Sequence, residues 1–278
     1  MSSNIQISEN RLWNSLNEMA LIGATQKGGV NRQTLTDLDK ESRDLFIKWC
    51  KAENLFVTID QIGNIFARRE GKNNNLPPIM SGSHLDTQPT GGKYDGVLGV
   101  LAGLEIVRTL NDLNIETKHP IMIVNWTNEE GSRFAPAMMA SAGYAGIYDI
   151  NTLLSAEDAE GNIFGKELEK IGWKGSEQVG KQKFHCYYEL HIEQGPILET
   201  EEIDIGVVTH GQGLKWLEVE LLGTEQHTGT TPMHVRKDTS LAMSEIILAV
   251  NNIANKNQPN ALGSVGHIEI FPNSRNVI

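Results

Sequence analysis

The chain has 278 residues, of which 39% are hydrophobic and 21% are charged, a composition typical of a globular protein with one large or two modest domains. Its formal net charge is −11 and no run of Lys and Arg forms a basic patch, which argues against a DNA or RNA partner. The two cysteines, Cys50 and Cys186, stand alone and fit a reducing compartment rather than a disulfide scaffold.

The first ten residues lack a basic stretch followed by an apolar block, so no secretory signal is expected. No apolar run is long enough to span a bilayer. We therefore expect a cytoplasmic protein without a membrane partner.

The first elements in chain order are predicted to be two helices and two strands. Residues 8–21, and a stretch that begins at about Asp39, carry apolar residues at helical spacing. The Gly-, Asn- and Thr-rich residues 22–36 between them are expected to form a loop. Residues 55–60 and 62–68 favour strands.

Residues 81–99 combine three potential ligands, His84, Asp86 and Asp95, with five glycines. Because glycine weakens helices and strands alike, we expect a loop that holds chemistry on a rigid scaffold. Residues 91–93, Gly-Gly-Lys, do not complete a phosphate-binding loop, since the required glycine before them and the Ser or Thr after them are absent.

The residues of this loop are suited to binding a metal ion. His84 offers an imidazole nitrogen, and Asp86 is placed to orient the ring through its second N–H. Asp95 adds a carboxylate oxygen from across the loop. The alternative contains no metal: an Asx-turn at Asp86, a turn carboxylate at Asp95 and a structural histidine.

Residues 97–110 predict a helix that is apolar almost all round, and residues 120–126 predict a buried parallel strand. This order indicates an α/β domain, whose sites lie at the carboxyl ends of its strands. Glu129 and Glu130 follow one strand as His84 follows another, so these loops should meet. One carboxylate could bind a metal while the other takes a proton from water. The alternative is an ordinary acidic helix start.

A third loop repeats this pattern. Residues 135–145 predict a helix, residues 150–182 predict polar helices and loops, and residues 187–192 predict a strand that contains His191 and is followed by Glu193. A lone histidine here would more often be structural. Three such loops in one α/β domain together favour a metal site.

From residue 203 onward the pattern indicates a separate small α+β domain. Its expected strands are residues 203–208, 215–222 and 265–271, and its expected helix is residues 239–255. His227 and Asn276 fall in its loops, where residue type alone more often indicates a structural role.

Four motifs stand out in order: residues 82–96, 128–134, 189–196 and 227–233, and residues 273–278 add a fifth. Together they resemble the motifs of the hydantoinase/carbamoylase family of dimetal amidohydrolases. That family includes N-carbamoyl-L-amino-acid hydrolases, β-ureidopropionases and allantoate amidohydrolases. The resemblance covers nearly the whole chain.

The resemblance implies two divalent metal ions, for which zinc is the first expectation and manganese, cobalt or nickel suit overlapping ligand sets. His84 and His191 would hold one ion, Glu130 would hold part of the other, and Asp95 would bridge the two.

The resemblance also implies roles in the reaction. Glu129 would be the general base, and Asp86 would orient its neighbouring histidine. Gln194, His227 and Asn276 would contact the substrate, with His227 stabilising the oxyanion of the tetrahedral intermediate.

The implied fold is a dimetal-peptidase-like α/β catalytic domain, residues 1–211, with an inserted α+β lid and dimerisation domain, residues 212–278, both incomplete in this chain. Relatives of the family continue past the point that matches Ile278, and that part would carry an arginine for the substrate carboxylate and the last metal-ligand histidine. We expect a homodimer for a full-length form, and poor stability with little activity for this chain.

The implied reaction is hydrolysis of the carbamoyl C–N bond of an N-carbamoyl amino acid, a small ureido acid, which releases ammonia and carbon dioxide. Two alternatives stay open. One is allantoate hydrolysis, and the other is an inactive truncated remnant that serves only as an interaction module.

Overall fold

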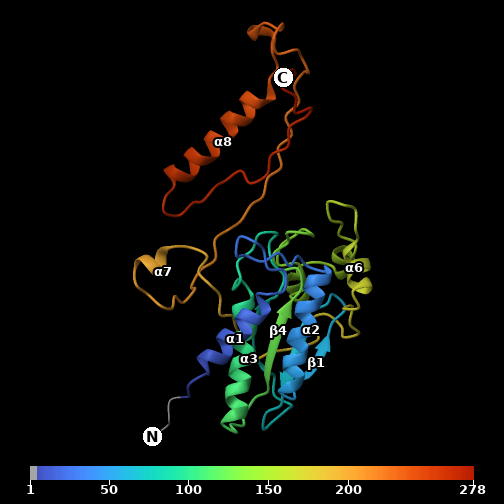
Figure 1. Ribbon diagram of the computed structural model, residues 1–278, viewed down its shortest axis with the longest axis vertical. Helices are drawn as coiled ribbons and strands as arrows, with labels where there is room; N and C mark the ends of the chain where they lie inside the picture. The colour runs from blue at the N-terminus through green and yellow to red at the C-terminus, as the bar shows by residue number, and fades with distance from the viewer. Residues whose placement is uncertain (1–4) are drawn as a thin grey trace. The chain divides into compact units, whose positions relative to one another are not determined.

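The computed structural model describes residues 5–278, and the chain divides into two compact units, Met1–Ile205 and Gly206–Ile278 (Figure 1). The first four residues, part of the stretch inspected for a secretory signal, lie outside the described residues. Within residues 5–278, no helix combines the length and the apolar character needed to cross a membrane.

The first unit is built on a mixed five-stranded sheet with the strand order β1-β2-β4-β3-β5. Strand β3 runs parallel to both β4 and β5, whereas β2 pairs antiparallel with β1 and β4. The strands are β1 (Phe56–Ile59), β2 (Ile65–Arg69), β3 (Ile79–His84), β4 (Ile121–Trp126) and β5 (Cys186–Tyr188). The predicted α/β class and the parallel pairing of the 120–126 strand are confirmed.

Three long helices flank this sheet (Figure 1). Helix α3 (Val97–Asp112) packs on β3 and β4, α1 (Glu9–Met19) packs on α3, and α2 (Asp37–Ala52) packs beside β1. Ser8 and Thr36 cap the starts of α1 and α2, where the sequence predicted helices. The shorter helices are α4 (Met139–Tyr144), α5 (Ile150–Leu154), α6 (Phe164–Lys170) and α7 (Ile197–Thr200).

Both faces of the central strands are buried. Ile65 and Ile123 belong to the larger apolar core with the helices, whereas Phe66 and Met122 pack on the other face with Trp126. Since side chains alternate between faces along a strand, a continuous apolar run suits a strand that is covered on both sides.

The expectation that residues 81–99 form a loop throughout is wrong at its start, because β3 continues to His84. Gly82 accounts for this. A Cβ atom at Gly82 would lie 2.0 Å from the carbonyl oxygen of Val124 on β4. Glycine therefore permits close strand pairing here instead of ending the strand.

The predicted strand at residues 187–192 is shorter than expected. Strand β5 spans only Cys186–Tyr188, and its pairing with β3 ends where Tyr188 meets Ser81. The chain leaves the ladder at Glu189, whose carboxylate accepts hydrogen bonds from Ser83 Oγ and Tyr187 OH. His191 thus lies on a connecting segment beyond the strand.

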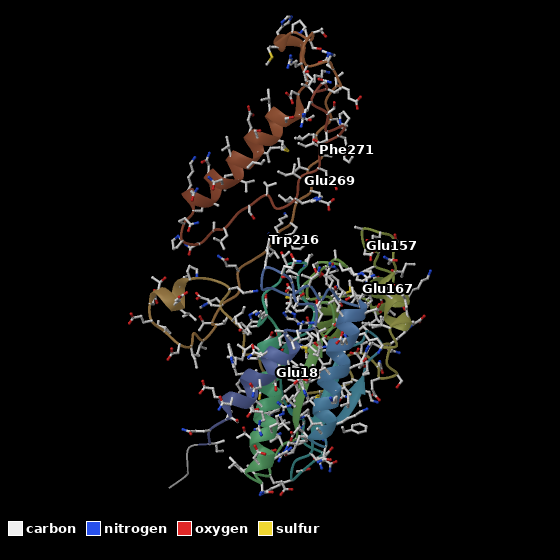
Figure 2. All side chains as sticks on the ribbon, in the orientation of Figure 1. Glu18, Glu157, Glu167, Trp216, Glu269 and Phe271 are labelled. Atoms are coloured by element: carbon white, nitrogen blue, oxygen red, sulfur yellow. The ribbon has the colours of Figure 1, made fainter. Side chains whose placement is uncertain are left out.

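The second unit contains the expected helix as α8 (Thr239–Lys256), preceded by a short 3₁₀ helix, Met233–Val235. The strands predicted at 203–208, 215–222 and 265–271 do not form anywhere in these described residues. Their backbones lack a ladder of hydrogen bonds to a partner, which is what an alternating sequence needs to become a strand. Apolar side chains such as Trp216 and Phe271 consequently stay exposed (Figure 2).

A buried arginine of α2, paired with an aspartate of the same helix, joins α2 to the turns at the sheet edge. Arg43 Nε donates to Asp39 Oδ2 at 2.9 Å, and both side chains are 0% exposed. Arg43 also donates to the Gly63 carbonyl at 2.9 Å and to Thr127 Oγ1 at 3.2 Å. The guanidinium therefore holds one helix and two turns in a fixed arrangement.

Replacing Arg43 with methionine should lower the free energy of unfolding by about 3–5 kcal/mol, because Asp39 would remain buried without its partner. Urea unfolding followed by tryptophan fluorescence measures this. The control is Arg68→Met, whose guanidinium pairs with the exposed Glu70 at 3.2 Å and should cost about 1 kcal/mol or less. Equal losses in the two variants would contradict the role of the buried pair.

Candidate metal centre

The parallel pairing of β3 and β4 brings the predicted site residues to one edge of the sheet. His84, the last residue of β3, lies opposite Trp126, the last residue of β4. Glu129 follows in the next turn, and its Oε2 lies 3.4 Å from His84 Nε2. The prediction that these two loops meet is confirmed.

The imidazole of His84 is held by a main-chain contact. Its Nδ1 lies 2.8 Å from the carbonyl oxygen of Asp86, so Nδ1–H donates and the lone pair of Nε2 is left free. The residue is 1% exposed. Burial lowers the pKa of His84, but the carboxylates of Asp86 and Glu129 outweigh burial and raise it.

The expectation that the Asp86 carboxylate orients His84 needs correction. Asp86 Oδ1 lies 3.8 Å from Nδ1, farther than its own carbonyl oxygen. The carboxylate instead accepts the backbone N–H groups of Glu129 at 3.3 Å and Glu130 at 3.2 Å. In the irregular segment after His84, the main chain of Asp86 faces the ring and its side chain faces the neighbouring loop.

His84, Asp95 and His191 form what we call the metal group. One potential ligand atom from each lies within 4.8 Å of the others. His191 Nε2 is 3.2 Å from Asp95 Oδ1, and His84 Nε2 is 4.0 Å from the same oxygen. His191 Nδ1 lies 2.9 Å from the carbonyl of Ile192, so both imidazoles can present Nε2 to a common point. Two imidazoles and one carboxylate are a donor set that suits zinc and related ions.

Gly96 provides the space that the ring of His84 occupies. A Cβ atom at Gly96 would lie 2.4 Å from His84 Nε2, and the backbone there has a φ of +66°. Both the contact and the left-handed conformation require glycine. Gly96, the N-cap of α3, therefore allows the His84 ring to take the position in which it could bind a metal ion.

Glu130 is not a member of the metal group among the described residues. Its Oε2 accepts a hydrogen bond from Gln88 Nε2 at 2.8 Å. Its Oε1 is buried and has no protein partner. A buried carboxylate oxygen without a donor is costly unless a cation or a ligand satisfies it.

Glu129 has the environment of a proton acceptor. Burial raises the pKa of its carboxyl group, His84 opposes this effect, and the negative charges of Asp86 and Glu130 reinforce it. A carboxylate whose pKa is raised toward neutral exchanges protons more effectively near neutral pH. A cavity of about 590 Å³ adjoins Glu129, with walls that are mainly aromatic and methionine side chains.

A hydrogen-bond network that the sequence did not predict supports the segment leading to His191. Ser83 Oγ and Tyr187 OH donate to the two oxygens of Glu189, at 2.5 and 2.6 Å. Trp126 Nε1 donates to Tyr187 OH at 3.1 Å. Burial raises the pKa of the Tyr187 hydroxyl, and the neighbouring Glu189 adds to the effect. Glu189 belongs to a recognised motif, which was the only sequence signal for it.

The three residues expected to contact the substrate fall in two places. In the first unit, Gln194 Nε2 donates to Asp95 Oδ2, so it lies directly at the metal group. In the second unit, His227 and Asn276 lie together: His227 pairs with Val277, and Thr228 N donates to the Asn276 carbonyl at 3.1 Å. Substrate contact by these residues stays a prediction.

Replacing Gly96 with alanine should weaken zinc binding about tenfold or more, because the new methyl group would displace the His84 ring. Zinc titration with a competing chelator measures the affinity. Gly92→Ala is the matched control, since no atom lies within 4 Å of an added Cβ there. Zinc affinity that is unchanged in Gly96→Ala would mean that His84 does not bind the ion.

Comparison with known proteins gives an independent line of evidence. The family model "Peptidase family M20/M25/M40" matches residues 80–270. An N-carbamoyl-L-amino-acid amidohydrolase of Rhizobium meliloti is 56% identical over 275 residues, which cover 99% of this chain and 66% of the relative. A ureidoglycolate hydrolase of Arabidopsis thaliana is 32% identical, over 100% of this chain and 60% of the relative.

A solved structure gives the same result. The crystal structure of a hydantoinase/carbamoylase family amidase from Burkholderia vietnamiensis superposes with a TM-score of 0.92 at 48% identity, over 100% of this chain and 67% of that one. This chain therefore spans about two thirds of the length of these two proteins. The predicted resemblance is confirmed: the chain belongs to peptidase family M20/M25/M40 and, within it, to the hydantoinase/carbamoylase amidases.

Proposed function

We propose that this protein hydrolyses the carbamoyl C–N bond of N-carbamoyl-L-amino acids. One observation carries the proposal: the metal group lies beside Glu129 in a chain that is 56% identical to an N-carbamoyl-L-amino-acid amidohydrolase. The reaction needs three things in one place: a group that polarises the substrate carbonyl, an activated water and a proton acceptor. The first unit supplies residues suited to all three tasks.

His84, Asp95 and His191 would hold a first divalent ion, with zinc as the first candidate. Asp95 would also serve a second ion together with Glu130, whose buried Oε1 has no protein partner. When bound, such ions polarise a carbonyl group and lower the pKa of water. Four carboxylates around two histidines leave this edge rich in negative charge, which favours a divalent cation.

In the proposed reaction, Glu129 takes a proton from the attacking water and delivers it to the leaving nitrogen. Water adds to the carbamoyl carbon, and the C–N bond to the amino acid breaks with the amino acid as the leaving group. The carbamate that remains is released and decomposes to ammonia and carbon dioxide. The raised pKa of Glu129 suits both proton transfers. Gln194, His227 and Asn276 are proposed to hold the substrate, with His227 donating to the developing oxyanion.

The second unit is proposed to serve as a lid and a dimerisation module. Helix α8 supports this, because Leu241, Leu248 and Ile253 are each about 60% exposed on it. Exposed apolar side chains on one helix are typical of a surface that packs on another protein surface. A cytoplasmic location agrees with Cys50 and Cys186, which are both free thiols.

A second candidate is the hydrolysis of another ureido acid. The ureidoglycolate hydrolase relative at 32% identity favours this class, although the carbamoylase relative is far more similar. Parallel assays with N-carbamoyl-L-amino acids, ureidoglycolate and allantoate separate these candidates. The proposal requires the carbamoyl amino acids to give the highest kcat/KM.

Replacing Glu129 with glutamine should leave the metal content unchanged and lower kcat by at least about 100-fold, because the amide cannot accept the proton. Ammonia release from an N-carbamoyl-L-amino acid measures the rate. Glu18→Gln is the control, since Glu18 is exposed on α1 (Figure 2). Near-parental turnover by Glu129→Gln would remove Glu129 from its role.

Replacing Asp95 with alanine should abolish both metal binding and hydrolysis, because the carboxylate stands between the two imidazoles. Metal content is measured by atomic emission after dialysis. Asp44→Ala, at an exposed position of α2, should retain both properties. Full metal content in Asp95→Ala would exclude Asp95 as a bridging ligand.

A further inference from the structure

A fully buried arginine lies behind the metal group, in the segment between α1 and α2. Arg32 is 0% exposed, and the sequence assigned no function to it or to the loop around it. Its Nε donates to the carbonyl of Leu85 at 2.9 Å. Its Nη1 donates to the carbonyls of Ile22 at 2.8 Å and Met19 at 3.4 Å.

The main chain of Arg32 also binds the segment that follows His84. Its N–H donates to Thr87 Oγ1 at 2.8 Å, and its carbonyl accepts the Thr87 N–H at 3.0 Å. With the guanidinium bond to Leu85, three hydrogen bonds therefore connect Arg32 to residues 85–87. These bonds lie on both sides of Asp86 in the sequence and restrain the two peptides that flank it.

Asp86 is the residue on which the site geometry depends. Its carbonyl receives the His84 Nδ1–H, and its carboxylate receives the N–H groups of Glu129 and Glu130. The Asp86 carbonyl belongs to the peptide whose N–H, on Thr87, donates to the Arg32 carbonyl, and the Leu85 carbonyl belongs to the peptide on the other side of Asp86. Arg32 thus holds both peptides that flank Asp86, and with them the contacts of Asp86 to His84, Glu129 and Glu130.

The surroundings of Arg32 show why a charged residue can occupy this place. Burial lowers the pKa of its guanidinium, while the negative charges of Asp39 and Asp86 oppose that effect. An apolar side chain would leave the carbonyls of Leu85 and Ile22 without donors, which is costly in a buried place. The planar guanidinium donates to both carbonyls in fixed directions, which an ammonium group does not reproduce.

We propose that Arg32 is a positioning residue of the metal centre, which acts on His84, Glu129 and Glu130 through the segment at residues 85–87. Its hydrogen bonds go to Met19, Ile22, Leu85 and Thr87 rather than to His84, Asp95 or His191. The proposal rests on the proposed function only in that the metal group binds a divalent ion.

Cobalt titration of the full 278-residue protein tests this proposal. The visible absorption of bound Co²⁺ reports the ligand geometry, and competition with zinc gives the affinity, so neither readout needs turnover. Arg32→Met should lower the Co²⁺ affinity about 10- to 100-fold and alter the absorption bands, the usual effect of losing a partner that orients the ligands. Arg32→Lys, which keeps the charge and a donor group but not the planar fork of donors, should recover part of the loss.

Arg108→Met is the matched control. Arg108 is another buried arginine, 8% exposed, and it donates to Ser15 Oγ at 2.9 Å near the end of α3 remote from Asp95. Its replacement should lower the melting temperature without changing the Co²⁺ affinity or spectrum. This control separates a general loss of stability from a specific effect on the metal group.

Parental Co²⁺ affinity and spectrum in folded Arg32→Met would overturn the proposal, as would an equal loss of affinity in Arg108→Met. If Arg32→Met does not fold, Arg32→Lys decides, and parental affinity and spectrum there would overturn it too. A failure of the proposed function has a different signature. In that case the metal-loaded parent would release no ammonia from carbamoyl amino acids, while the Arg32 variants would still bind Co²⁺ more weakly.

Discussion

The parallel pairing of β3 and β4 is the constraint on which the candidate site depends. In this register, His84 and Trp126 end their strands side by side, so the loops that follow share one edge of the sheet. Gly82 permits the pairing, because any side chain there would collide with the Val124 carbonyl. The 3.4 Å approach of His84 to Glu129 follows from this backbone arrangement. The imidazole and the proposed base therefore meet because of strand geometry.

Two buried arginines beneath this edge of the sheet fix the positions of the loops that carry the candidate ligands. Arg43 connects α2 with Thr127, just before the two glutamates, and Arg32 connects the N-terminal segment with Leu85, just after His84. Both arginines are 0% exposed. A buried guanidinium is tolerated only where carbonyls and carboxylates surround it in good geometry. The hydrogen bonds of both arginines therefore hold the loops that carry the ligands, which is how a rigid supporting structure preorganises a site.

The charges at the edge give a chemical reason for a metal ion that is independent of sequence similarity. Asp86, Asp95, Glu129 and Glu130 gather around two histidines that can each present a free nitrogen. Burial raises the pKa of the carboxyl groups of Asp86 and Glu129, as expected when negative charges are crowded away from water. A divalent cation between the imidazoles would relieve this repulsion. The similarity to amidohydrolases and the electrostatics of the site thus support the same class of chemistry.

The sequence by itself determined the elements whose signal is local. Helical spacing predicted α1, α2, α3 and α8, and the apolar run at 120–126 predicted the buried parallel strand whose loop meets His84. The tertiary structure decided what depends on distant partners. Gly82 lies in a strand because β4 approaches it closely, β5 ends at Tyr188, and the strands expected in the second unit do not form. Asp86 holds His84 by its main chain, and Arg32 supports that segment from more than fifty residues away in the sequence. The spacing of residues in the sequence cannot reveal such contacts, because the folded backbone sets the direction of each side chain and so determines which group it meets.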